Sequence, residues 1–193
     1  MDWLFAAITG YLLGSIPFGL LLTRAFGAGD VRNIGSGSIG ATNVLRTGRK
    51  GLAAATVLLD AAKGVGAVLA AAALGPGTEG LAAVAAVAGH CFPVWLKFKG
   101  GKGFATAAGV CAVLAWPVFL ISGAVWAVAV AAMRISSVAS LSAMVVAPMA
   151  AWLLGYAEVI PPLIAIALIV FVQHRANIGR LTRGEEPRIG AGK

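Results

Sequence analysis

Apolar residues are gathered into long segments along the chain, and short polar stretches separate them. We count seven apolar segments, at about 3–23, 51–73, 80–96, 104–115, 117–133, 141–154 and 159–174. Several of them approach the roughly 20 consecutive apolar residues with which a helix crosses a bilayer. The pattern therefore predicts an all-α polytopic membrane protein with seven transmembrane helices, built as a single integral-membrane domain over residues 1–193.

Two segments are short for a full span, namely 104–115 and 141–154. We expect them to end below the membrane surface, where polar backbone can face a wet cavity. The pair Trp116-Pro117 predicts the break between the fourth and fifth segments, because proline disfavours helix at the residue before it. The first segment lacks the basic region and cleavage site of a signal peptide, so 3–23 should remain as a membrane helix.

Composition agrees with a membrane protein. Hydrophobic residues make up 60% of the chain and charged residues only 11%, whereas about a quarter of an ordinary globular chain is charged. No tail is long enough to form a soluble domain. The formal net charge of +8 is therefore interpreted as loop charge, and we expect no nucleic-acid partner.

The basic residues indicate an orientation. With seven spans, all 15 Lys and Arg except Lys63 fall on one side, in 24–50, 97–103, 134–140 and the C-terminal tail. The other side holds no Lys or Arg, but it holds Asp2, Glu79 and Glu158. Because basic loops stay in the cytoplasm, the N-terminus is predicted outside and the C-terminus in the cytoplasm.

The richest polar stretch lies between the third and fourth apolar segments. It carries three lysines and three glycines, which are Lys97, Lys99, Lys102, Gly100, Gly101 and Gly103. Glycines let backbone N–H groups converge without steric cost, and such a concave set binds anions. A helix beginning near Phe104 adds the positive end of its dipole. The stretch predicts a phosphate or carboxylate site at the membrane surface; the alternative is a basic loop that only sets topology.

A second glycine-rich stretch, 32–46, lies in the first cytoplasmic loop. Its short hydroxyl and amide side chains supply hydrogen bonds, and they belong to Ser36, Ser38, Thr42 and Asn43. Arg46 ends the stretch with a planar fork of donors suited to phosphate. The alternative is a flexible linker, although Gly/Ser linkers seldom carry this mixture of asparagine, threonine and arginine.

Two further polar groups come from the last cytoplasmic elements. Ser137 and Ser140 are one helical turn apart and share a face if the helix has begun, but helix capping is the strong alternative for Ser136 or Ser137. His174 and Asn177 are three residues apart at the end of the last segment, so both can point the same way.

Three ionisable residues lie in or beside the apolar segments. Asp60 and Lys63 fall inside the second segment and should face the bundle interior as a pair, with structural and catalytic roles both open. His90 stands beside the glycine-lysine stretch, and a local hydrogen bond and a ligand role are equally open for it.

Other kinds of site are poorly supported. Cys91 and Cys111 are interpreted as buried unpaired thiols, and no His, Cys, Asp or Glu cluster has metal-ligand spacing, so we expect no metal and no cofactor. Cytoplasmic acids are scarce, being Asp30, Glu185 and Glu186, which argues against a Ser-His-Asp triad. A cation-rich site at the lipid boundary suits a phosphorylated substrate with an acyl chain. Alternatives are a lipid or organic-anion transporter and a non-catalytic headgroup-binding scaffold.

The chain resembles a known family through motifs along its whole length. They lie at 14–19, 33–43 with Arg46, 59–64, 89–93, 98–103 with Ala105-Thr106, 136–140 and 174–178. Motifs of this length, order and spacing are similar to those of the bacterial membrane acyl-phosphate:glycerol-3-phosphate acyltransferases.

The resemblance implies an activity. Such enzymes move a fatty acyl group from acyl phosphate to the 1-hydroxyl of glycerol 3-phosphate, which gives lysophosphatidic acid and inorganic phosphate in the first step of phospholipid synthesis. It also implies seven helices in the bacterial inner membrane, with the active site facing the cytoplasm. A soluble acyl-phosphate synthase is a partner to consider.

Together, the motifs and the residue chemistry give candidate site residues. The catalytic candidates are Ser36, Lys102, Ser140 and His174, and the substrate-binding candidates are Thr42, Asn43, Arg46, His90, Lys99, Gly100, Gly101, Gly103 and Asn177. The general base stays open between a phosphate oxygen of the substrate and His174.

Overall fold

The computed structural model describes residues 1–190, and within that range the chain is helical, without any strand. The α-helices are α1 (Asp2–Gly14), α2 (Phe18–Ala25), α3 (Ala41–Val44), α4 (Lys50–Leu74), α5 (Glu79–Cys91), α6 (Phe104–Leu114), α7 (Trp116–Met133), α8 (Ser136–Leu153), α9 (Ile160–Gln173) and α10 (Arg175–Thr182). Short 3-10 turns are η1 (Val31–Asn33), η2 (Leu45–Thr47), η3 (Val94–Leu96) and η4 (Ala157–Val159). Lys193, which belongs to the basic tail of the sequence, lies outside the described residues.

Each predicted apolar segment is helical, but the first is not one helix. It is divided into α1 and α2, and the break falls at Ser15–Pro17 between them. Proline has no backbone N–H and its ring disfavours helix at the preceding residue, so Pro17 interrupts the helix that the apolar pattern alone predicted. The prediction of a continuous helix over 3–23 was therefore wrong at this point.

The two segments expected to be short differ. The fourth is short as predicted, because α6 has 11 residues and ends at Leu114; the next residue, Ala115, has a φ of −158° and is not helical. The sixth is not short, because α8 has 18 residues and already begins at Ser136. Ser136 and Ser137, which precede the predicted apolar segment, form the first turn of this helix, because hydropathy alone does not detect a polar helical turn.

The helices have the length and composition of a multi-pass membrane protein. Within the described residues, five helical stretches are long and apolar enough to cross a membrane, including α1 with α2 taken together. A sixth is reached if α9 and α10, bent by 62° at their junction, count as one broken span. The remaining apolar helix, α6, is too short to pass the same criterion.

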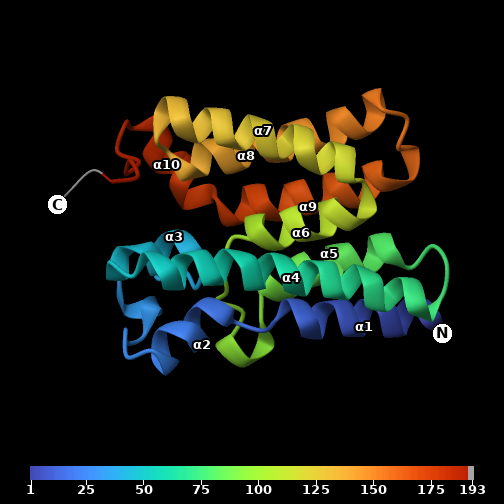
Figure 1. Ribbon diagram of the computed structural model, residues 1–193, viewed down its shortest axis with the longest axis horizontal. Coiled ribbons are helices and arrows are strands. Elements are labelled where there is room, and N and C mark those ends of the chain that lie inside the picture. Colours follow the sequence, from blue (N-terminus) through green and yellow to red (C-terminus); the bar gives the residue numbers. More distant parts are fainter. Residues whose placement is uncertain (191–193) are drawn as a thin grey trace.

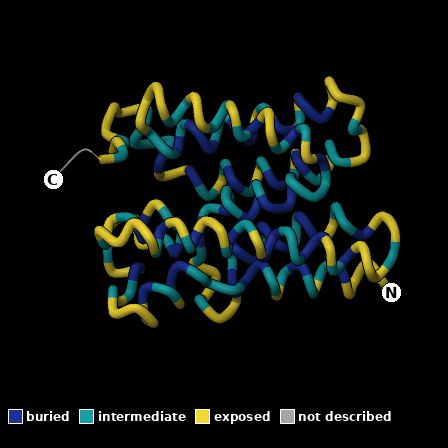
Figure 2. Tube along the Cα trace, in the orientation of Figure 1, coloured by how far each residue is buried: buried dark blue, intermediate teal, exposed yellow. Residues whose placement is uncertain are grey.

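The helices form two groups with α6 between them (Figure 1). In one group α1 packs against both α4 and α5, and in the other α7 and α9 pack against α8. Figure 2 shows buried residues on the sides of the helices that face one another and exposed residues on the outer sides. Many exposed residues are large and apolar, such as Leu58, Val128 and Leu168, which suits a surface covered by lipid.

Small residues let the helix backbones approach closely. A Cβ atom on Gly109 of α6 would overlap the backbone of Ala61 in α4, and one on Gly64 of α4 would overlap the carbonyl of Thr106 in α6. Gly14 meets Ala86 in the same way between α1 and α5. Such contacts are typical of membrane helices, which associate by close packing because lipid offers no hydrophobic driving force between them.

Gly109→Ala should destabilise the protein, whereas Gly123→Ala should not. Gly109 faces a neighbouring backbone that cannot rotate away, and overpacking of this kind costs about 1–3 kcal/mol. A Cβ on Gly123 of α7 meets nothing within 4 Å, so there the alanine only gains helix propensity, about 1 kcal/mol. Thermal unfolding of the purified variants in detergent measures the difference, and equal midpoints would contradict this account of the α4–α6 contact.

Candidate functional site

The glycine-lysine turn (residues 100–103) connects the end of α5 to the start of α6. The Gly100 N–H donates to the carbonyl of Cys91 at 3.1 Å, and the Gly101 N–H donates to the carbonyl of His90 at 3.0 Å. Gly103 has a φ of +86°, a conformation that favours glycine, and it forms the N-cap of α6. The expectation that these glycines form an anion nest is therefore wrong for Gly100 and Gly101, whose N–H groups bind the last carbonyls of α5.

What the turn offers an anion is Lys102 and the N-terminus of α6. The first N–H groups of a helix have no partner within the helix, and they carry its positive dipole end. Lys102 is half-buried, and this burial lowers its pKa from 10.5 to about 8. The charge of Glu186 opposes that shift, whereas Arg180 and Arg46 reinforce it. Lys102 thus lies within the electrostatic reach of residues from the first loop and from α10 and the tail.

The junction of α9 and α10 packs directly on this turn. The buried side chain of His174 caps α9, and its Nδ1 lies 2.8 Å from the carbonyl of Val170. A carbonyl can only accept, so Nδ1 carries a proton and a neutral ring keeps its lone pair on Nε2. A Cβ on Gly103 would contact Val170, and Gln173 donates to the carbonyl of Cys91 at 3.2 Å. The end of α9, which carries His174, therefore lies against the glycine-lysine turn and the end of α5.

The carboxylate of Glu186, in the tail, binds three side chains from two helices, α8 and α10. It accepts hydrogen bonds from Ser137 of α8 at 2.7 Å, from Arg180 of α10 at 2.7 Å, and from the side-chain amide of Asn177. Burial alone would raise the pKa of Glu186, but these hydrogen bonds lower it below its usual value. Glu186 is thus an ionised carboxylate at the centre of this cluster.

Sequence reasoning did not assign a role to Glu186. The available signal was its rarity, because it is one of few acids on a side of the protein crowded with cations. Its neighbour Asn177 also has an unexpected feature: its Oδ1 is buried and finds no hydrogen-bond partner among residues 1–190. A buried acceptor without a donor is uncommon, and it offers a place for a ligand hydroxyl.

The serines at the start of α8 do not cap the helix within the described residues. The N-cap of α8 is Ile135 and no side chain within residues 1–190 caps the helix, while Ser137 uses its hydroxyl for Glu186. Ser140 lies one turn further along α8 and is buried. The hydroxyl of Ser136 lies 3.3 Å from that of Thr42, which brings the first loop to the start of α8.

Asn43 organises the first loop from inside. Its buried amide nitrogen donates to three loop carbonyls, those of Val31, Ile34 and Ser38, at 2.7, 3.1 and 2.8 Å. Its Oδ1 accepts from the Ser36 N–H at 3.2 Å and from Arg46 at 3.4 Å. Asn43 was expected to bind substrate, but its side chain is occupied in shaping the loop that presents the exposed Ser36, Thr42 and Arg46.

Two other candidates lie apart from the cluster. His90 is buried, and its ring contacts Lys63 and Gly101 rather than an open site. Of its two open roles, the structure shows the local hydrogen bond. Lys99 is exposed and follows η3, which projects beyond α1 and α2, on the side opposite α8 and α10 (Figure 1). Asp60 and Lys63 form the predicted interior ion pair, with Nζ and Oδ1 2.7 Å apart.

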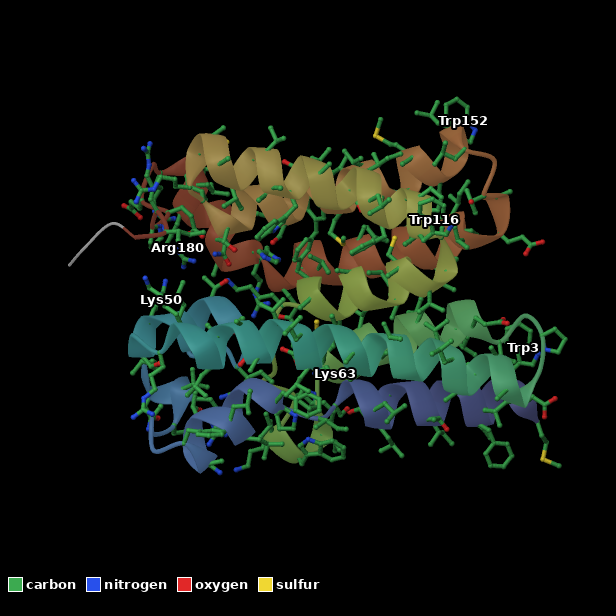
Figure 3. All side chains as sticks on the ribbon, viewed as in Figure 1. Trp3, Lys50, Lys63, Trp116, Trp152 and Arg180 are labelled. Carbon is green, nitrogen blue, oxygen red and sulfur yellow. The ribbon has the colours of Figure 1, made fainter. Side chains whose placement is uncertain are left out.

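The two ends of the bundle differ in character. Figure 3 shows Arg180 and Lys50 toward one end and Trp3, Trp116 and Trp152 toward the other, with Lys63 between them. The three tryptophans are exposed, as expected for aromatic side chains at a membrane interface. The cluster around Glu186, to which Arg180 belongs, therefore lies at the basic end of the bundle.

Comparison with known proteins identifies the family. A family model described as glycerol-3-phosphate acyltransferase matches residues 4–184. A glycerol-3-phosphate acyltransferase of Erythrobacter litoralis is 59% identical over 190 residues, which cover 98% of this chain and 96% of the relative. A second, from Mesorhizobium japonicum, is 56% identical over 186 residues, covering 96% and 95%.

Solved structures agree with this. The glycerol 3-phosphate form of PlsY, an integral membrane glycerol 3-phosphate acyltransferase, is 38% identical, with a TM-score of 0.92 over 98% of this chain and 96% of that one. Its lysophosphatidic acid form gives 36% and 0.91 with the same coverage. Because the helical arrangement and the sequence agree over nearly the full length of both chains, this protein belongs to the glycerol-3-phosphate acyltransferase family.

Proposed function

We propose that this protein transfers a fatty acyl group from acyl phosphate to the 1-hydroxyl of glycerol 3-phosphate, releasing lysophosphatidic acid and inorganic phosphate. The observation that carries the proposal is the meeting of Lys102 and the α6 N-terminus with the His174–Asn177 junction at the basic end of an apolar bundle. The relatives named above are acyltransferases for glycerol 3-phosphate, which supports the acceptor.

The donor needs little chemical activation. Acyl phosphate is a mixed anhydride, so the acceptor hydroxyl attacks the carbonyl carbon, an ester bond forms, the anhydride C–O bond breaks and phosphate leaves. The protein has to align the two substrates and to stabilise the charge on the carbonyl oxygen and on the departing phosphate. Lys102, Arg46 and the α6 N-terminus are suited to the second task.

The acceptor is assigned to the α9–α10 junction. The lone pair on His174 Nε2 and the unpartnered Oδ1 of Asn177 both accept hydrogen bonds, as recognition of a glycerol hydroxyl requires. The hydroxyl proton goes either to His174 or to a phosphate oxygen of the substrate. Ser36 and Ser140 are proposed to contact the phosphate groups, and Thr42 to support them. Asn43, His90 and Lys99 take no direct contact in this proposal.

An apolar groove on the lipid-facing side suits the acyl chain. It lies between α8 and α9 and is lined by Met144, Val145, Pro148, Ile164, Ala167, Leu168 and Phe171. Met144 is one helical turn beyond Ser140, and Phe171 is one turn before His174. The groove therefore begins beside the proposed catalytic residues and continues along the hydrophobic length of the bundle.

We also propose the membrane arrangement that the basic loops indicate. All seven apolar segments enter the bacterial inner membrane as a single domain, with the N-terminus outside and the C-terminus and active site on the cytoplasmic side. The separation of Lys50 and Arg180 from the three exposed tryptophans supports this orientation. A soluble acyl-phosphate synthase is the proposed source of the donor at that face.

Purified protein given synthetic acyl phosphate and glycerol 3-phosphate should release inorganic phosphate and form lysophosphatidic acid in equal amounts. Lys102→Ala should lower turnover by roughly 100-fold or more, because it removes a charge that stabilises the departing phosphate. Phosphate release and lipid product are measured in the same sample. Phosphate without lipid would indicate hydrolysis, and no reaction from folded protein would favour a transporter or scaffold.

His174→Gln tests the identity of the general base. Glutamine can still accept and donate hydrogen bonds but cannot take up a proton near neutral pH, so base catalysis by His174 predicts a loss of about 10²–10⁴-fold in kcat. Near-normal kcat would exclude His174 as the base and leave the substrate phosphate in that role. A rise in KM alone would mean that His174 only binds the acceptor.

Activity should fall as the pH rises through about 8, because Lys102 loses its proton there. A loss of stability caused by the deprotonation of Lys102 cannot explain this fall in activity. The lowered pKa means that the folded protein binds fewer protons than the unfolded chain between about pH 8 and 10.5, so the contribution of Lys102 to stability rises over that range. The measurement is kcat/KM against pH, with Lys102→Arg as control, since arginine stays charged. The same decline in both proteins would exclude Lys102 as its cause.

A further inference from the structure

Three buried ionisable side chains lie inside the bundle and take no part in the proposed chemistry. Asp60 and Lys63 are one turn apart on α4, and His90 is near the end of α5. Their exposed fractions are 2%, 5% and 3%. Lys63 Nζ lies 2.7 Å from Asp60 Oδ1 and 2.9 Å from His90 Nδ1. Charged groups at such a depth in a membrane protein are costly and are usually kept for function.

The contacts of Lys63 determine the state of the His90 ring. An ammonium group has three hydrogens and no lone pair, so Lys63 donates to the Ile16 carbonyl at 2.8 Å and to His90 Nδ1 at 2.9 Å, while the Asp60 carboxylate lies within ion-pair distance of its Nζ at 2.7 Å. Nδ1 therefore accepts, so the neutral ring carries its proton on Nε2. The Asp60 carboxylate pairs with Lys63 at 2.7 Å, and the Lys63 ammonium in turn fixes both the tautomer and the orientation of the imidazole.

The opposite edge of that ring supports the glycine-lysine turn. A Cβ on Gly101 would overlap the ring at Nε2, so the Cα of Gly101 lies directly against it. The carbonyl of His90 also accepts the Gly101 N–H at 3.0 Å. His90 thus holds Gly101 with both its backbone and its side chain, and the next residue in the chain is Lys102. A continuous line of contacts runs from Asp60 through Lys63, His90 and Gly101 to Lys102.

We propose that Asp60 and Lys63 are positioning residues for acyl transfer, acting through His90 on the glycine-lysine turn. By fixing the imidazole, they set where Gly101 rests, and so where Lys102 and the first turn of α6 point. The inference depends on the proposed function only in that the turn is taken to hold the substrate phosphate.

A purely structural role gives a different expectation. Lys63 also binds the Ile16 carbonyl at the break between α1 and α2, where Pro17 has no N–H to contribute. If that contact were the whole purpose of the pair, its removal would lower stability and leave the turnover of folded protein unchanged. The positioning role predicts that turnover falls and that the fall requires His90.

The test is a double-mutant cycle between the ion pair and His90. Asp60→Asn with Lys63→Gln removes both charges together, so no unpaired charge stays buried. This double variant should lose about 10- to 100-fold in kcat/KM, the scale on which a displacement of about 1 Å at a reacting group acts. His90→Phe, which keeps a ring but has no acceptor, should lose a similar amount, and the combined variant should lose no more than either.

Additive losses in the combined variant would overturn the inference, and so would unchanged kcat/KM in the ion-pair variant. Ser122→Ala is the matched control, because in the part of the chain that the structure describes the buried hydroxyl of Ser122 binds only carbonyls of its own helix α7. It should leave kcat/KM unchanged. His90→Gln retains an acceptor for Lys63 and should keep more activity than His90→Phe.

Hydrogen exchange in detergent tests the same inference without turnover. Backbone amides of residues 98–106 should exchange faster in His90→Phe and in the ion-pair variant than in the wild type, and Ser122→Ala should not change them. Unchanged exchange there would overturn the inference. If the wild type performs no acyl transfer, the proposed function fails, while this comparison still decides whether Lys63 holds the turn. If the ion-pair variant does not fold, exchange in His90→Phe against His90→Gln decides it.

Discussion

Polar groups inside an apolar bundle have to find their partners within the protein, and this requirement fixes the structure around the end of α5. The final carbonyls of α5 would be left unpaired, and the N–H groups of Gly100 and Gly101 together with the amide of Gln173 satisfy those of His90 and Cys91. The same bonds draw the glycine-lysine turn and the end of α9 onto α5. The position of Lys102 thus follows from the pairing of the buried His90 and Cys91 carbonyls at the end of α5.

Close packing of small residues makes this arrangement possible. Glycine at positions 64 and 109 lets α4 and α6 touch backbone to backbone, and so α6 can end early and still be held firmly. A short helix whose N-terminus is fixed by its neighbours directs its dipole at one point. The chemistry proposed for the protein needs a rigid positive end of this kind, because the donor is already activated and mainly has to be aligned.

Acidic residues are few at the basic end, and Glu186 has a disproportionate effect there. Its carboxylate holds Ser137, Asn177 and Arg180 together, and in doing so it partly balances the cations that surround Lys102. A phosphorylated substrate enters a field in which the positive groups are already oriented. The tail containing Glu186 is itself anchored, since the Ile189 carbonyl accepts from the guanidinium of Arg134 at 2.9 Å.

The sequence by itself determined the helical class and the segment positions, because apolar runs of spanning length have few alternatives in a membrane. It also determined the family, through motifs such as those around Asn43 and Lys102. Tertiary structure alone decided which polar groups stay available. Asn43 and the Gly100 N–H turned out to be occupied, while Glu186 became central. These outcomes depend on contacts between residues distant in the chain, as from Ser137 to Glu186, and neither hydropathy nor motif spacing contains that information.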